Sequence, residues 1–272
     1  MIPIYSYILS MLTYTVFLIL MTEGFRRSVF FGIAVNIGLI VLLFFSKNVE
    51  GWFRWAKDLS VLIPMVAVGL GRIASKKELN APFWKFFKGP AILGFLCFIL
   101  SLNIFEASLK DIQLGNYFNG LCGLIMIACI PMNIKSSWRF DKNNFSTLVS
   151  DLSLGWCLLY TTWNACFVYA ESPAFVSASL CILLVPELYN FFSKKKKISN
   201  LWLHARIYTL MLHVSIRSFH DVFTPFMNAT SWYNEAFKDV WGVINFILMA
   251  AYAVWWFTAI ARKRRKKEHI TA

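Results

Sequence analysis

Long apolar runs, separated by short polar segments, follow one another along this chain. Because a helix needs about 20 mostly apolar residues to cross about 30 Å of hydrocarbon, runs of this length predict membrane-spanning helices. The clear runs are Ile2 to Met21, Val29 to Phe45, Pro90 to Phe105, Leu154 to Ala170, Pro173 to Phe192 and Val240 to Ala261.

Three further runs have weaker patterns. The run from Tyr117 to Met132 is short but uncharged, and the run from Leu59 to Ile73 is short and contains Pro64. The run from Leu201 to Phe223 carries Arg and His, so it can span only if its polar face is covered. Together the runs predict an all-α integral membrane protein, a polytopic bundle of about nine transmembrane helices, with eight as the alternative.

The composition supports a membrane protein. Apolar residues make up 58% of the 272 residues and charged residues 15%, with a mean hydropathy of +0.58. A water-soluble domain would carry about 25% charged residues. The six cysteines all fall within apolar runs without a C-x-x-C pair. We therefore expect small core residues with reduced thiols, which form neither a disulfide framework nor a zinc site. The sequence predicts no cofactor.

The formal charge of +13 could indicate nucleic-acid binding, but the basic residues alternate between loops in the manner of the positive-inside rule. With the N-terminus outside and the C-terminus cytoplasmic, 20 of the 27 basic residues lie on the cytoplasmic side. They are Arg26 and Arg27; Arg72, Lys76, Lys77, Lys85 and Lys88; Lys135, Arg139 and Lys142; Lys194 to Lys197; and Arg262 to Lys267.

This asymmetry predicts a lipid-bilayer protein that does not bind nucleic acid. We expect one transmembrane domain over residues 1–261 and a basic cytoplasmic tail over residues 262–272 that meets anionic lipid headgroups. The first run has no basic residue ahead of it and is expected to be a retained span rather than a signal peptide. The oligomeric state does not follow from the sequence.

One span carries an unusual polar stripe. Arg206, His213, Arg217 and His220 are spaced 7, 4 and 3 residues apart. At about 100° per residue they fall within about 60° of each other on one helix face. Such a face must contact partner helices or a wet cavity, because ionisable groups are costly in hydrocarbon.

Three interpretations of the stripe stay open. The arginines could pair with acids such as Glu187 and Asp151 and only hold the bundle together. They could instead bind or move a small anionic molecule, since a guanidinium is a rigid fork of donors suited to carboxylate or phosphate. Alternatively, His213 and His220 could serve an intramembrane enzyme, although no H-E-x-x-H motif is present.

A second polar segment is expected to line the same site, with Tyr160, Trp163 and Asn164 on the run from Leu154 to Ala170. The predicted anion site therefore consists of Arg206, His213, Arg217, His220, Glu187, Asn164, Trp163 and Tyr160. Elsewhere, amides within spans predict hydrogen bonds between helices and glycines predict close helix packing. These are Asn36, Asn103, Asn119 and Asn245, and Gly69, Gly71, Gly120 and Gly123.

The segment Trp163-Asn164-Ala165-Cys166-Phe167-Val168-Tyr169, with the Arg and His span that follows, resembles an uncharacterised family of bacterial multispan membrane proteins known only as a domain of unknown function. The likeness covers the C-terminal half of the chain. It implies a bacterial cytoplasmic membrane and no particular activity.

Overall fold

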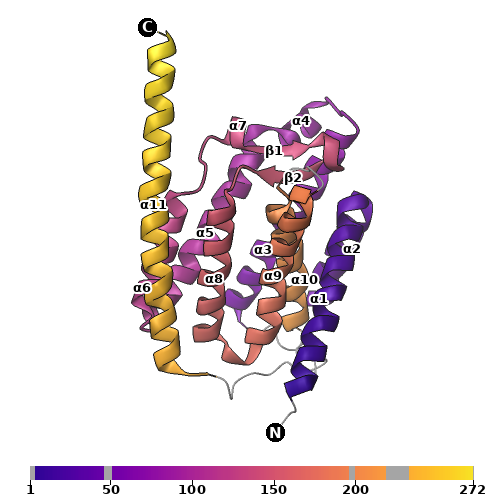
Figure 1. The fold of residues 1–272 in the computed structure, drawn as a ribbon. Helices are drawn as coiled ribbons and strands as arrows, with labels where there is room; N and C mark the ends of the chain where they lie inside the picture. Colours follow the sequence, from indigo (N-terminus) through magenta and orange to yellow (C-terminus); the bar gives the residue numbers. More distant parts are fainter. Residues whose placement is uncertain (1–3, 46–50, 196–199, 219–232, 272) are drawn as a thin grey trace. The chain divides into compact units, whose positions relative to one another are not determined.

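The computed structural model describes residues 4–45, 51–195, 200–218 and 233–271, which are almost entirely helical (Figure 1). The N-terminal helices are α1 (Ile4–Arg27), α2 (Val29–Leu43), α3 (Trp52–Lys76), α4 (Pro82–Lys88), α5 (Pro90–Gln113), α6 (Tyr117–Ala128) and the single turn α7 (Ile134–Ser137). The C-terminal helices are α8 (Leu154–Glu171), α9 (Val176–Lys195), α10 (Trp202–Ser218) and α11 (Glu235–Thr271). The predicted tail begins inside α11, which continues as helix to Thr271.

The chain divides into two compact units. The first unit consists of Met1–Ile99, Met132–Asp151 and Ala174–Ser231. The second consists of Leu100–Pro131, Leu152–Pro173 and Trp232–Ala272.

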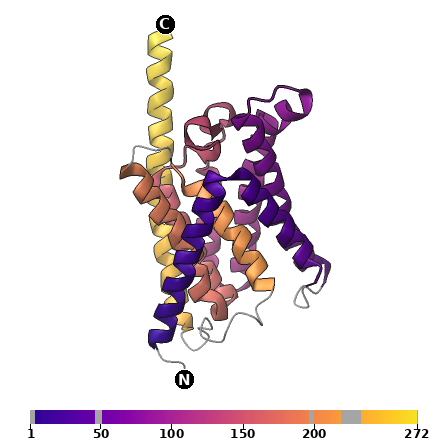
Figure 2. The ribbon, with the colours of Figure 1, turned by 90° about the vertical axis from the view of Figure 1, so that its right-hand side faces the viewer.

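In the first unit, α1, α9 and α10 pack against one another and α2 packs against α3 (Figures 1 and 2). Two glycines on α3 permit close packing. A Cβ at Gly69 would lie 2.5 Å from Ile33, and one at Gly71 would lie 2.6 Å from the Phe87 carbonyl oxygen. The amide of Asn36 donates to the Leu62 carbonyl at 2.9 Å, joining α2 to α3. The predictions for these three residues are confirmed.

A short β-hairpin at one end of the first unit is absent from the sequence-based prediction. Strands β1 (Trp138–Asp141) and β2 (Thr147–Ser150) pair antiparallel, with Trp138 opposite Ser150. The Asp141 side chain accepts a hydrogen bond from the Asn143 amide at the turn. Phe145 and Ser146 then adopt φ of 53° and 52°, a left-handed backbone that non-glycine residues rarely occupy.

In the second unit, α11 packs along α6 and α8, and α6 packs against α8. A Cβ at Gly123 on α6 would meet the Trp163 ring of α8 at 2.8 Å. Asn245 of α11 donates to the Asn119 side-chain oxygen of α6 at 2.8 Å. The predicted packing role of Gly123 and the interhelical bonds of Asn119 and Asn245 are thus confirmed.

Helix lengths and composition indicate a membrane-embedded protein. Five of the described segments are long and apolar enough to cross a bilayer: Ile4–Arg27, Asp58–Lys76, Pro82–Gln113, Pro173–Phe192 and Glu235–Arg262. The apolar helices Val29–Leu43 and Tyr117–Ala128 are shorter. The all-α class and membrane embedding are confirmed, whereas the count of nine spans and their orientation stay predictions.

Candidate functional site

The predicted stripe on α10 is largely enclosed by protein. Arg206 and His213 are both 4% exposed. Tyr14 Oη lies 3.4 Å from His213 Nδ1. The guanidinium of Arg217 is half-buried and lies over the Phe175 ring at 4.5 Å. His220 lies outside the described residues.

The other predicted site residues belong to two different units. Glu187 of α9 is in the first unit, where its Oε1 accepts a hydrogen bond from Trp202 Nε1 at 2.8 Å. Tyr160, Trp163 and Asn164 are in the second unit. There the indole of Trp163 is fully buried and donates to the Asn119 carbonyl at 2.9 Å.

A third arginine, Arg72, is more deeply buried than either arginine of the stripe. It was predicted to be a loop charge, yet it lies within α3 and is 1% exposed. Its Nη1 donates to the Phe25 carbonyl at 2.8 Å and to Tyr208 Oη at 2.9 Å. Its Nη2 donates to the carbonyls of Arg26 at 2.7 Å and Phe145 at 3.3 Å.

These four bonds explain why Arg72 is held inside the protein. The carbonyls of Phe25 and Arg26 belong to the last turn of α1, whose C-terminal end carries partial negative charge. The guanidinium therefore caps α1 and, through Phe145, ties it to the hairpin. No carboxylate of a described residue forms an ion pair with Arg72.

The nearby acid, Glu23, is bound by other residues. Its carboxylate accepts from Arg26 at 2.7 and 2.8 Å, from Arg27 at 2.6 Å and from Tyr189 Oη at 3.1 Å. Arg26 also donates to Asn144 Oδ1 at 2.6 Å and lies over the Phe145 ring. Two guanidinium groups, those of Arg26 and Arg27, thus share a single carboxylate at this end of the first unit.

Several buried polar atoms around the hairpin form no hydrogen bond with a described residue. They are Thr22 Oγ1, Arg72 Nε, Asn144 Nδ2, Thr147 Oγ1 and Ser150 Oγ. Each belongs to a side chain that is at least nine-tenths buried. Such atoms normally have a partner, which is often water or a ligand. We call these five residues, together with Arg26 and Tyr208, the hairpin-end cluster.

Part of this cluster continues into α10. The ring of His204 is fully buried and packs edge-on against the Tyr208 ring, with 4.7 Å between the ring centroids. It also interacts electrostatically with the positive charges of Arg72 and Arg26. β2 also packs against α10. The cluster is therefore polar, enclosed and rich in positive charge.

The second unit contains a polar network of a different kind. Asp111 is fully buried, and its two oxygens accept from Asn116 at 2.9 Å and from Asn119 at 2.6 Å. Asn245 donates to Asn119 and lies 2.9 Å from Thr162 Oγ1, which also accepts from the Trp241 indole at 2.8 Å. Among the described residues, no buried side-chain polar atom of this unit lacks a partner.

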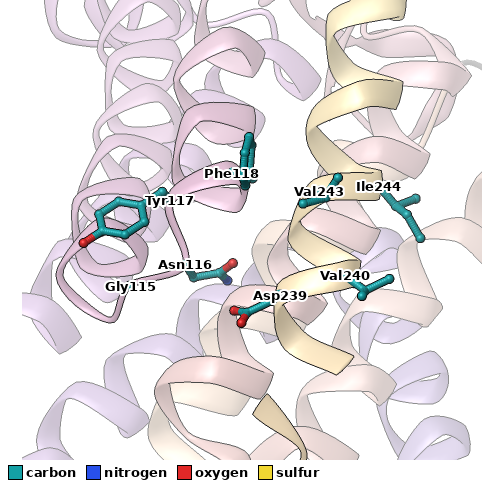
Figure 3. A pocket seen from close by; sticks show the side chains of 8 residues that line it. All are labelled: Gly115, Asn116, Tyr117, Phe118, Asp239, Val240, Val243 and Ile244. Atoms are coloured by element: carbon teal, nitrogen blue, oxygen red, sulfur yellow. The ribbon is translucent and has the colours of Figure 1, made fainter. Parts of the chain in front are cut away.

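A pocket of about 440 Å³ lies beside this network, between the start of α6 and the second and third turns of α11 (Figure 3). Its polar residues are Asn116 and Asp239, and the rest of its lining is apolar or glycine. None of the seven described residues of the predicted anion site lines it. None of the predicted site residues belongs to the hairpin-end cluster either. The sequence pattern did not indicate that cluster.

We compared the chain with known proteins, and no family model, curated protein or solved structure matches it. The resemblance based on Trp163 to Tyr169 therefore stays a prediction.

Proposed function

We propose that the protein crosses the membrane nine times, with its N-terminus outside and its basic loops on the cytoplasmic side. Contacts within the first unit support this orientation. Arg26 at the end of α1 bonds Asn144 of the hairpin, and Lys142 of the hairpin bonds Glu78 just after α3 at 2.5 Å. Three segments assigned to the same side by their charge are thus in contact.

Reporter fusions test this topology. A reporter that is active only inside the cell, inserted after Ser75 or attached at the C-terminus, should be active at both positions. Activity of a reporter that works only outside, at either position, would overturn the proposed orientation.

Within this topology, we propose that the protein binds or moves a small anionic molecule, and that the hairpin-end cluster holds it. Arg72 carries the proposal, because its buried positive charge has no carboxylate partner among the described residues. Leaving a buried charge without a counter-charge is costly. An anion beside Arg72 Nε would supply that charge. One hairpin hydroxyl, that of Thr147 or that of Ser150, offers an additional donor, since these two residues lie on opposite faces of β2.

This proposal keeps the anionic ligand inferred from the sequence but assigns it to different arginines. Arg206 and Arg217 contribute to the polar interior of the same unit. The proposed contact residues are Arg72, Arg26 and one of the two hairpin hydroxyls.

Binding of simple anions by the purified full-length chain tests the proposal. Phosphate, sulfate, acetate and bicarbonate would be titrated by calorimetry in detergent or nanodiscs. We expect at least one of them to bind, and R72K to weaken its binding at least tenfold, since an ammonium lacks the planar fork of the guanidinium. Flux of that anion into proteoliposomes would then distinguish transport from binding alone.

R139Q is the matched control, because Arg139 lies on the same hairpin but is exposed and paired with Asp151 at 2.8 Å. It should bind the anion as the wild type does. If no anion binds to the wild type, or if R139Q loses as much affinity as R72K, the cluster serves only to hold α1 and the hairpin together.

A further inference from the structure

The pocket between α6 and α11 has apolar walls that open to the surface. Tyr117, Phe118, Val240 and Ile244 line it and are all exposed. Ligand pockets measure about 300–1,000 Å³, so about 440 Å³ suits a small headgroup with part of an alkyl chain. Both helices are apolar and the pocket lies at their ends, where headgroups meet hydrocarbon.

The polar side of the pocket offers hydrogen-bond acceptors. Asn116 is 3% exposed, and its amide nitrogen donates to Asp111 Oδ1 at 2.9 Å and to Cys166 Sγ at 3.5 Å. Its Oδ1 accepts no hydrogen bond from a described residue. Figure 3 shows this side chain, just before α6, next to the Asp239 side chain of α11.

The close approach of α11 positions the Asn116 oxygen. A Cβ at Gly242 would lie 2.5 Å from that oxygen, so only glycine leaves room for it. The amide is therefore held by Asp111 on one side and α11 on the other. Its acceptor atom is fixed before any ligand arrives, which lowers the entropic cost of binding.

The charge around the pocket is negative, although the whole chain carries +13. The acids are Asp239, Glu235 and the buried Asp111, while Lys238 supplies the positive charge, with its Nζ 3.2 Å from Asp239 and 3.6 Å from Glu235. The lining itself contains no basic side chain. A cation with N–H donors complements this arrangement.

We propose that this pocket binds the ammonium headgroup of an aminophospholipid of the phosphatidylethanolamine class. A primary ammonium has three donors, which match the Asp239 carboxylate and the Asn116 oxygen. A trimethylammonium has none and is recognised by aromatic cages, which this pocket does not form. The acyl chain would run along the exposed apolar side chains of Phe118 and Ile244.

Native mass spectrometry of the full-length chain tests the proposal. Delipidated protein would be mixed with phosphatidylethanolamine, phosphatidylcholine or phosphatidylglycerol carrying identical acyl chains. We expect the ethanolamine lipid to be retained about tenfold more strongly than the other two. We expect D239N to reduce its retention about tenfold, because that change removes the carboxylate and keeps the shape.

Two further variants complete the experiment. V243F should abolish retention by filling the pocket, while leaving both polar groups in place. D151N removes an exposed carboxylate that pairs with Arg139 in the first unit and should retain the lipid as the wild type does. Equal retention of the choline lipid, or unchanged retention by D239N, would overturn the proposal. The outcome is independent of anion binding, because Arg72 lies in the other unit.

Discussion

Replacing Arg72 with methionine tests whether its guanidinium holds α1 to the hairpin. The change removes four hydrogen bonds, to the carbonyls of Phe25, Arg26 and Phe145 and to Tyr208 Oη. Bonds from a charged donor contribute about 1.5–3 kcal/mol each, so the gross loss is about 6–12 kcal/mol. Methionine also avoids the several kcal/mol that burying the charge costs. We expect a net loss of about 3–5 kcal/mol of stability in the first unit.

The cysteines provide the assay, because all six are buried and free. Cys97 and Cys181 lie in the first unit, whereas Cys122 and Cys157 lie in the second. A thiol reagent can reach them only when the surrounding unit opens. Since about 1.4 kcal/mol is tenfold in an equilibrium constant, R72M should label Cys97 and Cys181 about 100-fold to several thousand-fold faster. Labelling of Cys122 and Cys157 should change much less.

K142M is the matched control for this experiment. Lys142 is exposed and pairs with Glu78 at 2.5 Å, and water screens a pair that is exposed on both sides. Its labelling rates should stay within about tenfold of those of the wild type. If R72M labels Cys181 no faster than K142M does, the four bonds do not hold the first unit together and the reasoning is refuted.

Three other outcomes are expected. G242A should destabilise the second unit by about 1–3 kcal/mol, because the new Cβ would press on the Asn116 side chain. The loss should appear as faster labelling of Cys122, and an unchanged labelling rate would contradict the tight fit. W163F should lower the stability of the second unit by about 1–3 kcal/mol, because the Asn119 carbonyl loses the hydrogen bond from the Trp163 indole. The labelling rate of Cys122 measures this loss too. Lys142 and, more weakly, Lys88 lower the pKa of the Glu78 carboxyl. The stabilisation that these lysines provide is therefore fully present above the ordinary pKa of a glutamate, and it is lost as the pH falls through the lowered pKa of Glu78. An NMR titration should show this pKa rising in K142Q, and no rise would exclude the pairing.

The helices follow from the sequence because their pattern is local. The run from Val29 to Phe45 matches α2. The Ser28 hydroxyl caps the start of this helix by accepting a hydrogen bond from the Phe31 amide at 3.2 Å. The weak run from Leu59 to Ile73 lies within the 25-residue helix α3, despite Pro64 inside it. Length and hydropathy identify such helices, but they do not show which of the shorter ones cross the membrane.

The hairpin could not be predicted in the same way. Its strands have four residues each, and its turn contains Phe145 and Ser146 in a conformation usually taken by glycine or asparagine. Asp141, Asn143 and Asn144 favour a turn, but the local sequence does not predict that Phe145 and Ser146 take this conformation. Tertiary contacts support it, including the bond from Arg72 to the Phe145 carbonyl.

Arg72 was missed for a related reason. A basic residue near the end of an apolar run is normally solvated, and the positive-inside pattern assigns it to a loop. The neighbouring Gly71 was the available signal, because a glycine at that position lets the Phe140 and Phe87 segments approach α3. Burial of Arg72 depends on carbonyls contributed by α1 and the hairpin, which are far away in sequence.

The hairpin also has a consequence for how deep the first unit is expected to lie in the bilayer. Within the described residues its sheet has only two strands, so each strand keeps one edge whose peptide groups have no partner strand. Hydrocarbon does not accept such edges, and Arg139 and Asp151 are exposed beside β1. We therefore expect the hairpin to lie among headgroups or in water, and Arg72, which donates to its Phe145 carbonyl, to lie near the level at which the hydrocarbon ends.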